Sequence, residues 1–298
     1  MAATKMLNLP EELVTDIFSK VKGHSSIAAL CGQNPLPFNG EKVFTFSMDG
    51  EAAIVGEGEA KPASTSAFTP KVIRPIKFVY QTRVSDEFLK SSDEGRLNYL
   101  QAFGNGFAVK MARALDIAAM HGVNPRTMTD VAGLAGNNFD DANLITNVIT
   151  YAAATADDNL EAAVQDVVAG LASVNGIAIS PAFGSAMAKI KVNGVAQYPE
   201  FRFGGAPGSF AGYALSMNPT VPMAKSGGDI DHVILGDFQN AFRWGYAANI
   251  PLEVIEYGDP DGAGRDLKQY NEVCLRSEAY IGWGILDGDS FAVVHQEA

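Results

Sequence analysis

Hydrophobic residues repeat along the chain with two different periods, and the change of period marks out its elements. Over residues 94–121 they recur every three or four positions, as in an amphipathic helix of about 40 Å at 1.5 Å per residue. A second helical repeat runs from about Leu160 to Leu171. In the first 35 residues, one more apolar face ends at Gly23 and comprises Leu13, Val14, Ile17, Phe18 and Val21.

Strict alternation of apolar and polar residues predicts strands in the other parts of the chain. The longest alternation covers 240–256 and predicts one extended strand, and another covers 273–285. Short apolar runs predict further buried strands at 177–179, 213–217, 233–235 and 291–294. Strands and helices mixed in this order predict an α+β fold.

Residues 41–84 predict a long two-stranded excursion. One limb alternates through Phe44 and Phe46, and the expected return limb covers 76–84. Between the limbs, Gly56–Ser66 forms a polar tip rich in turn residues. An isolated hairpin of this length is marginally stable, and the short arm helix before it also needs a surface to lie against. We therefore expect both segments to reach over a neighbouring subunit.

Charge narrows the possible functions. The 298 residues include 34 acidic and 22 basic side chains, a formal net charge of −12, and no block of consecutive basic residues. Such a chain is repelled by nucleic acid at long range, which argues against a sequence-specific DNA or RNA reader. Cys31 and Cys274 are too few for a disulfide framework, although one bridge between them stays open. With no secretory signal and no apolar run of about 18 residues, we expect a soluble protein made in the cytoplasm.

Reactive constellations are scarce. The four histidines lack metal-ligand spacing, no phosphate-binding glycine loop ends in Lys-Ser/Thr, and no Gly-x-Ser-x-Gly elbow occurs. The segment 259–262 faintly resembles a calcium loop but lacks the closing glutamate, so we interpret it as a turn. We predict no catalytic, cofactor-binding or metal-binding residue and expect no enzymatic activity.

The order of the segments resembles one family. In the C-terminal half, Gly236-Asp237-Phe238 is followed by the alternating stretch, a turn-rich insert, Val273–Trp283 and Ser290–Val293. In the N-terminal half, Glu57–Pro62, Phe68–Val72 and Val84–Leu89 follow in turn. Together they are similar to the major capsid proteins of tailed bacteriophages with the Hong Kong 97-type fold, over roughly residues 10–298.

The resemblance implies an N-terminal arm (1–40), an extended loop (41–84), a peripheral domain with a long spine helix (85–122) and an axial domain (123–240). Residues 241–298 would supply the long strand and the return to the peripheral domain. It further implies homo-hexamers and homo-pentamers that form an icosahedral shell around double-stranded DNA in the virion, made in the host bacterial cytoplasm. The implied partners are scaffolding, portal and decoration proteins. Because the arm begins almost at Met1, we expect a separate scaffolding protein or none.

The residues expected to contact neighbouring subunits are Phe18, Phe44, Phe46, Glu57, Glu59, Lys61, Arg74 and Arg83. Some relatives cross-link subunits through a loop lysine and a peripheral asparagine, aided by a glutamate. Here the matching candidates are Lys61, Asn271 and Glu278, but Asn271 and Glu278 would lie on opposite faces of a regular strand. We expect a shell held by non-covalent overlap.

Two other functions stay open from the sequence. An encapsulin, a cellular compartment with the same fold around a cargo enzyme, is one; neighbouring portal and terminase genes would favour the phage. A soluble α+β enzyme or binding protein with an unrecognised pocket is the other. It predicts a small oligomer in light scattering, whereas a shell subunit predicts megadalton particles.

Overall fold

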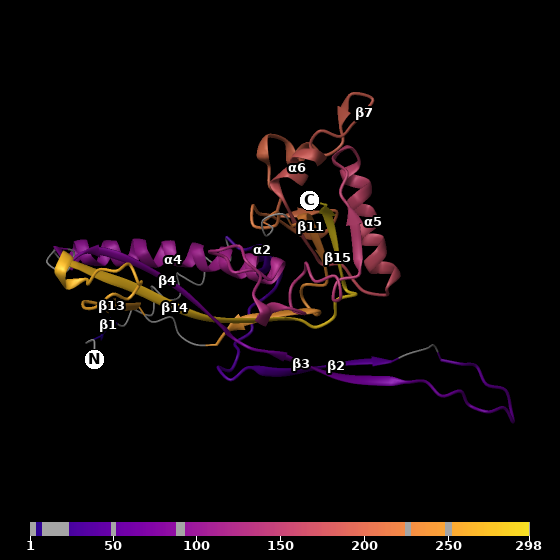
Figure 1. The fold of residues 1–298 in the computed structure, drawn as a ribbon. Coiled ribbons are helices and arrows are strands. Elements are labelled where there is room, and N and C mark those ends of the chain that lie inside the picture. The colour runs from indigo at the N-terminus through magenta and orange to yellow at the C-terminus, as the bar shows by residue number, and fades with distance from the viewer. Residues whose placement is uncertain are drawn as a thin grey trace.

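The computed structural model describes residues 4–7, 24–48, 52–87, 93–223, 228–247 and 252–297. The predicted arm helix before Gly23, including Phe18, lies outside the described residues. Three parts are visible in Figure 1: an elongated layer built on a long helix, a lobe above one end of it, and a two-stranded ribbon that extends away from both. No helix in the described ranges is both long and apolar enough to cross a membrane.

The peripheral layer consists of the helix α4 (Asp93–His121) and a five-stranded sheet. The central strand is β14 (Glu272–Ile285), and β4 (Ile76–Ser85) follows one of its edges through ten paired residues. On its other edge lie β12 (Phe242–Tyr246) and then β13 (Leu252–Ile255), and β1 (Thr4–Leu7) pairs with β13. The single strand predicted over 240–256 is thus two described strands along one edge of β14.

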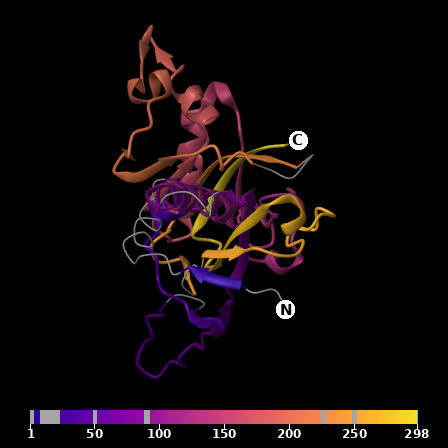
Figure 2. The same cartoon turned by 90° about the vertical axis from the view of Figure 1, so that its left-hand side faces the viewer.

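The apolar face of α4 explains why helix and sheet pack together. Figure 2 looks nearly along α4 and shows it against one side of the sheet, with the lobe above and the ribbon below. The buried helix residues contact a core that includes Phe78 of β4 and Trp283 of β14. The predicted helix 94–121 is confirmed, and its buried residues include Phe107, Met111, Leu115 and Ala118.

The lobe is built on a six-stranded sheet of order β5-β15-β11-β6-β10-β9. Its strands are β5 (Asn147–Thr150), β6 (Gly176–Ile179), β9 (Ser209–Phe210), β10 (Tyr213–Met217), β11 (Ile230–Gly236) and β15 (Phe291–Gln296). The predicted short strands are confirmed. The last one, β15, lies between β5 and β11 rather than in the peripheral layer, so the expected return of 241–298 to the peripheral domain is wrong for its final strand.

Helices α5 (Ala156–Ala169) and α6 (Pro181–Met187) pack on the lobe sheet. Ser180 caps α6, because its Oγ accepts a hydrogen bond from the Phe183 amide at 3.1 Å. The apolar stripe of α5 is narrower than predicted: Leu160, Ala163 and Val167 are buried, whereas Val168 and Leu171 are 53% and 91% exposed. The remaining small elements are β7 (Lys191–Val192), β8 (Val195–Ala196) and 3-10 turns at Ala132–Leu134, Ala153–Thr155, Pro199–Gly204 and Lys268–Tyr270.

A buried carboxylate joins the arm to the long helix. Asp116 of α4 accepts hydrogen bonds from the Ser26 amide at 2.8 Å, the Ile27 amide at 3.3 Å, Thr220 Oγ1 at 2.8 Å and Ser25 Oγ. Burial raises the pKa of Asp116, and these four donors act in the opposite direction. They hold the start of α2 (Ser26–Leu30) against α4.

The ribbon corrects the predicted strand pairing. Strand β2 (Glu41–Met48) pairs with β3 (Ser66–Ile73), not with residues 76–84, which form β4 and join the peripheral sheet. The alternation of 76–84 was sufficient to predict a strand but not its partner, since period carries no information on pairing. Pro75, which has no amide donor, lies between β3 and β4, where the chain passes from one sheet to the other.

Candidate assembly surface

The ribbon of β2 and β3 gathers its largest apolar side chains on one face. In its antiparallel register Phe44 lies opposite Pro70, and Phe46 lies opposite Phe68. Side chains alternate between faces along each strand, so these pairs share one face. That face, called here the ribbon face, comprises Phe44, Phe46, Met48, Phe68, Pro70 and Val72. The opposite face carries the Thr45–Thr69 pair, with Thr45 Oγ1 donating to the Thr69 carbonyl at 3.2 Å.

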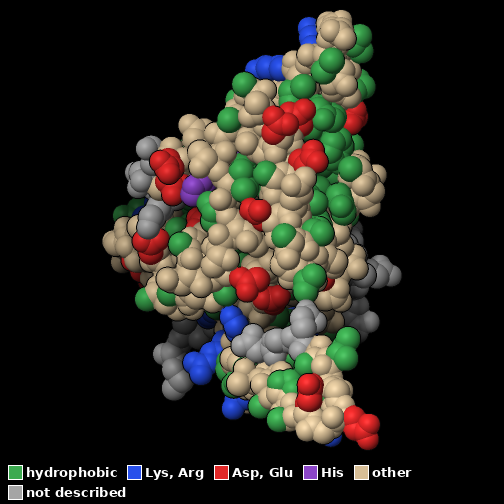
Figure 3. All heavy atoms as spheres, turned by 90° about the vertical axis from the view of Figure 1, so that its right-hand side faces the viewer, with side chains coloured by type: hydrophobic (Ala, Val, Ile, Leu, Met, Phe, Trp, Pro, Cys, Tyr) green, Lys and Arg blue, Asp and Glu red, His purple; other side chains and the backbone are tan. Residues whose placement is uncertain are grey.

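The ribbon face is open to solvent within one subunit. Phe46, Phe68 and Met48 are 62%, 64% and 74% exposed, and Phe44 and Val72 are about half exposed. The rings of Phe44 and Phe68 stack at a centroid distance of 4.7 Å and form one apolar surface. Hydrophobic side chains are visible on the ribbon at the lower end of Figure 3, beside the acidic groups there. A contiguous apolar patch of this kind marks a protein contact site.

The root of the ribbon is fixed to the peripheral layer. Ile73, at the end of β3, is 1% exposed and packs where Gly284 of β14 leaves room for it. Glu41, at the start of β2, forms a 3.1 Å ion pair with Arg243 of β12. Gly40 turns the chain into β2 with φ of +83°, a conformation that favours glycine. The ribbon therefore projects from a rigid base in a set direction.

The tip of the ribbon holds three of the predicted contact residues. Glu57, Glu59 and Lys61 are exposed in the stretch 52–65 that connects β2 to β3. A tight turn forms there, with the Glu59 amide donating to the Gly56 carbonyl at 3.2 Å and the Gly56 amide donating to Glu59 Oε2 at 3.1 Å. The tip lies at the far end of the ribbon in Figure 1, away from the lobe.

The two predicted arginines lie in different surroundings. Arg74 is exposed just beyond β3. Arg83 of β4 instead binds within its own chain: it pairs with Asp259 at 2.6 Å, with Glu272 at 3.1 Å and with Asp261. The hydrogen bonds from Arg83 hold the pKa of Asp261 well below its usual range. The guanidinium of Arg83 thus holds the turn predicted at 259–262. It pairs with the Asp259 and Asp261 carboxylates, the groups that gave this segment its faint resemblance to a calcium loop.

The cross-link candidates do not meet within one subunit. Asn271 ends a 3-10 turn in the left-handed conformation just before β14, with φ of +53°. Glu278, inside β14, forms a 2.6 Å ion pair with Lys77 of β4. Lys61 lies in the ribbon tip, which points away from this sheet. Because a cross-link would join different subunits, the candidate set stays a prediction.

Sequence reasoning missed four of the six residues of the ribbon face. Phe68, Pro70 and Val72 were not among the predicted contact residues because the return limb had been placed at 76–84, and Met48 was left out although it alternates with Phe44 and Phe46. The signal was present, since Phe68, Pro70 and Val72 alternate with polar residues in the same way as β2.

Comparisons with known proteins agree with this architecture. The Phage capsid family matches residues 7–295. A protein named Probable major capsid protein gp17, of Mycobacterium phage D29, is 24% identical over 96% of this chain and 89% of its own length. A solved structure from Mycobacterium phage Ogopogo is 33% identical, with a TM-score of 0.79 and coverage of 92% of both chains. A structure from Gordonia phage Cozz is 25% identical, with a TM-score of 0.73 over 92% of this chain and 87% of that one. This chain therefore belongs to the phage capsid family and has the Hong Kong 97-like fold.

Proposed function

We propose that this chain, the major capsid protein of a tailed phage, forms homo-hexamers and homo-pentamers that close into an icosahedral shell around double-stranded DNA. The single observation that carries the proposal is the exposed ribbon face, on a ribbon that projects from the subunit. In the shell this face would lie over a neighbouring subunit. Family membership supports the same function.

Within one subunit the ribbon gains little stability from folding. A two-stranded ribbon buries little of its own surface, and apolar side chains that stay in water contribute no hydrophobic stabilisation. Six apolar residues on one face of such a ribbon are explained by a partner that covers them. A second copy of the chain provides that partner at the high local density of a shell.

We propose a separate role in the shell for each part of the subunit. The arm (1–40) and the ribbon, shortened from the expected 41–84 to about 41–73, would contact neighbours. The peripheral layer would form the edges between subunits, and the lobe, residues 123–240 with β15, would surround the axis of each hexamer or pentamer. The lobe has a core of its own between its sheet and helices α5 and α6, which supports this division. The core of the peripheral layer continues onto the other face of the lobe sheet, at Ala178, Ile234 and Val293.

The remaining assignments rest on the family resemblance. We propose a structural role without catalysis, synthesis in the host cytoplasm, and association with scaffolding, portal and decoration proteins. The DNA would be enclosed without sequence readout, in accord with the net charge of −12. Of the two shell alternatives, relatives from phages support the virion over the encapsulin.

Expression of the full chain followed by negative-stain microscopy and light scattering tests the proposal. We expect closed particles of megadalton mass. A matched variant replaces residues 43–71 with a short Gly-Ser linker, which keeps Glu41, Ile73 and the root of the ribbon. It should remain folded by circular dichroism yet form no closed shells. A monomeric full chain, or a linker variant that closes normally, would overturn the proposal.

A further inference from the structure

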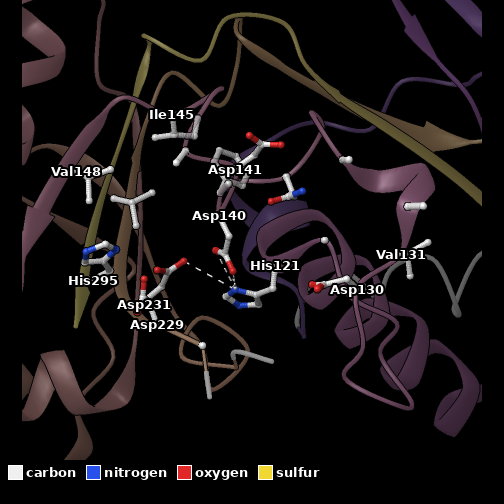
Figure 4. A pocket seen from close by; sticks show the side chains of 18 residues that line it. His121, Asp130, Val131, Asp140, Asp141, Ile145, Val148, Asp229, Asp231 and His295 are labelled. Carbon is white, nitrogen blue, oxygen red and sulfur yellow. Dashed lines mark hydrogen bonds and ion pairs between the residues drawn. The ribbon is translucent and has the colours of Figure 1, made fainter. Parts of the chain in front are cut away.

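A pocket of about 660 Å³ lies where the end of α4 meets the lobe. Its walls come from α4, from the loop after it, and from the lobe strands β5, β11 and β15. Figure 4 shows the carboxylates of Asp140 and Asp231 turned toward the ring of His121. One ligand atom from each of these three residues lies within 4.8 Å of the other two.

The histidine is held in an orientation that presents one nitrogen to the carboxylates. The Nε2 atom of His121 lies 3.1 Å from the Thr220 carbonyl oxygen, which can only accept, so Nε2 carries the proton and donates it. The Nδ1 atom then has a free lone pair in the neutral ring. It faces Asp140 Oδ2 at 3.0 Å and Asp231 Oδ2 at 3.9 Å, both of which are also acceptors. Three electron-pair donors therefore converge on one point.

Asp231 supplies an independent sign of a missing partner. This residue is 4% exposed, and its Oδ2 atom is buried without a hydrogen bond. A buried carboxylate oxygen without a partner costs free energy that a cation would recover. A positive charge at the point of convergence would give this oxygen a partner.

We propose that His121, Asp140 and Asp231 form a binding site for a divalent transition-metal ion, with Zn²⁺ as the best match. Ligands about 2.0–2.2 Å from a tetrahedral zinc lie roughly 3.3 Å from one another, and the observed separations of 3.0 Å and 3.9 Å bracket this value. The Thr220 carbonyl plays the part of the outer acceptor that orients a metal-binding histidine. The imidazole ligand favours zinc-like ions over Mg²⁺ and Ca²⁺.

The site is also accessible. The side chain of Asp140 is 32% exposed, whereas that of His121 is fully buried, so an ion would enter from the Asp140 side of the pocket. Water from the pocket would complete the coordination. The site joins His121 of the peripheral layer to Asp231 of the lobe, and bound metal would lock the junction between these two parts of the subunit.

Sequence spacing could not reveal this site. Its three residues belong to the end of a helix, a loop and a strand of a different part of the fold, and the histidines show no ligand spacing. The expectation of no metal ligand rested on that spacing alone.

Isothermal titration of the untagged, EDTA-treated full chain with ZnCl₂, and in parallel with MgCl₂, tests the proposal. We expect about one Zn²⁺ per chain, Mg²⁺ binding weaker by at least roughly tenfold, and a rise in melting temperature on adding Zn²⁺. Asp231→Asn should lose Zn²⁺ binding while the metal-free variant melts no lower than metal-free wild type, because it removes one of two facing carboxyl groups. This second readout separates loss of the site from loss of the fold.

Two matched controls line the same pocket outside the three-residue cluster. His295→Gln and Asp130→Asn should both keep the wild-type stoichiometry. Equal Zn²⁺ uptake by wild type and Asp231→Asn would overturn the proposal. It would also be overturned if wild type takes up no ion and its melting temperature responds only to pH, because protons would then balance the carboxylates.

Discussion

Replacing Phe46 and Phe68 together by serine removes the centre of the ribbon face while leaving the ribbon backbone paired. A phenylalanine buries roughly 200 Å² when fully covered, and these two are 62% and 64% exposed in the isolated subunit. A neighbour that covers them would remove about 250 Å² of apolar surface from water, worth about 6 kcal/mol at 25 cal/mol per Å². Even half of that weakens subunit association by roughly 150-fold.

The fold of the subunit should be little affected by the same change. Both rings lie mostly in solvent, where substitutions usually change stability by about 0.5 kcal/mol or less. We therefore expect the double variant to match the wild-type melting temperature in circular dichroism but to give subunits or small oligomers in light scattering and no closed shells in micrographs.

The control is Thr45→Ser with Thr69→Ser, a matched cross-strand pair on the opposite face of the ribbon. It should form shells at the wild-type yield. If the phenylalanine variant assembles as well as this control, the ribbon face contributes nothing to subunit contacts and does not bind a neighbour.

Three further predictions concern single side chains. Arg83→Met removes the guanidinium that pairs with the carboxylates of the turn, so amide hydrogen exchange should accelerate in residues 257–266 and stay unchanged in the lobe. Asp116→Ala leaves four donors without an acceptor and should lower the free energy of unfolding by about 3 kcal/mol in chemical denaturation. Although burial alone would raise the pKa of Asp237, hydrogen bonds from neighbouring side chains and a backbone amide lower it overall. The Asp237 carboxylate therefore stabilises the fold above the unfolded pKa of about 3.9, and this stabilisation is lost as pH falls through the lower folded pKa. In thermal melts, Asp237→Asn should thus lower the melting temperature less at pH 3 than at pH 7.

The local character of most elements follows from the sequence. The three- and four-residue spacing fixes α4, since one apolar stripe along 29 residues can be buried only as a helix. Alternation in the same way fixes β14 and the limb β2. The order of these elements was enough to show the resemblance to the capsid family, which the comparisons confirm.

Only the tertiary structure decided which strands pair and which distant side chains come together. Residues 76–84 alternate like a hairpin limb, yet β4 pairs with β14, where Phe78 gains a buried core that the ribbon does not offer. The composition of the ribbon face depended on this choice, because assigning β3 as the true partner brings Phe68 beside Phe46.

The pocket at the end of α4 likewise depends on contacts between segments that are distant in the sequence. His121, Asp140 and Asp231 are unremarkable in the sequence, and their meeting depends on how the lobe docks on the end of α4. Hydrophobic period is a property of neighbours along the chain, so the sequence by itself determined elements such as α4, β2 and β14, and the family. Contacts between distant segments depend on which surfaces bury best together, so only the folded chain decided the pairing of the ribbon and the place of the proposed metal site.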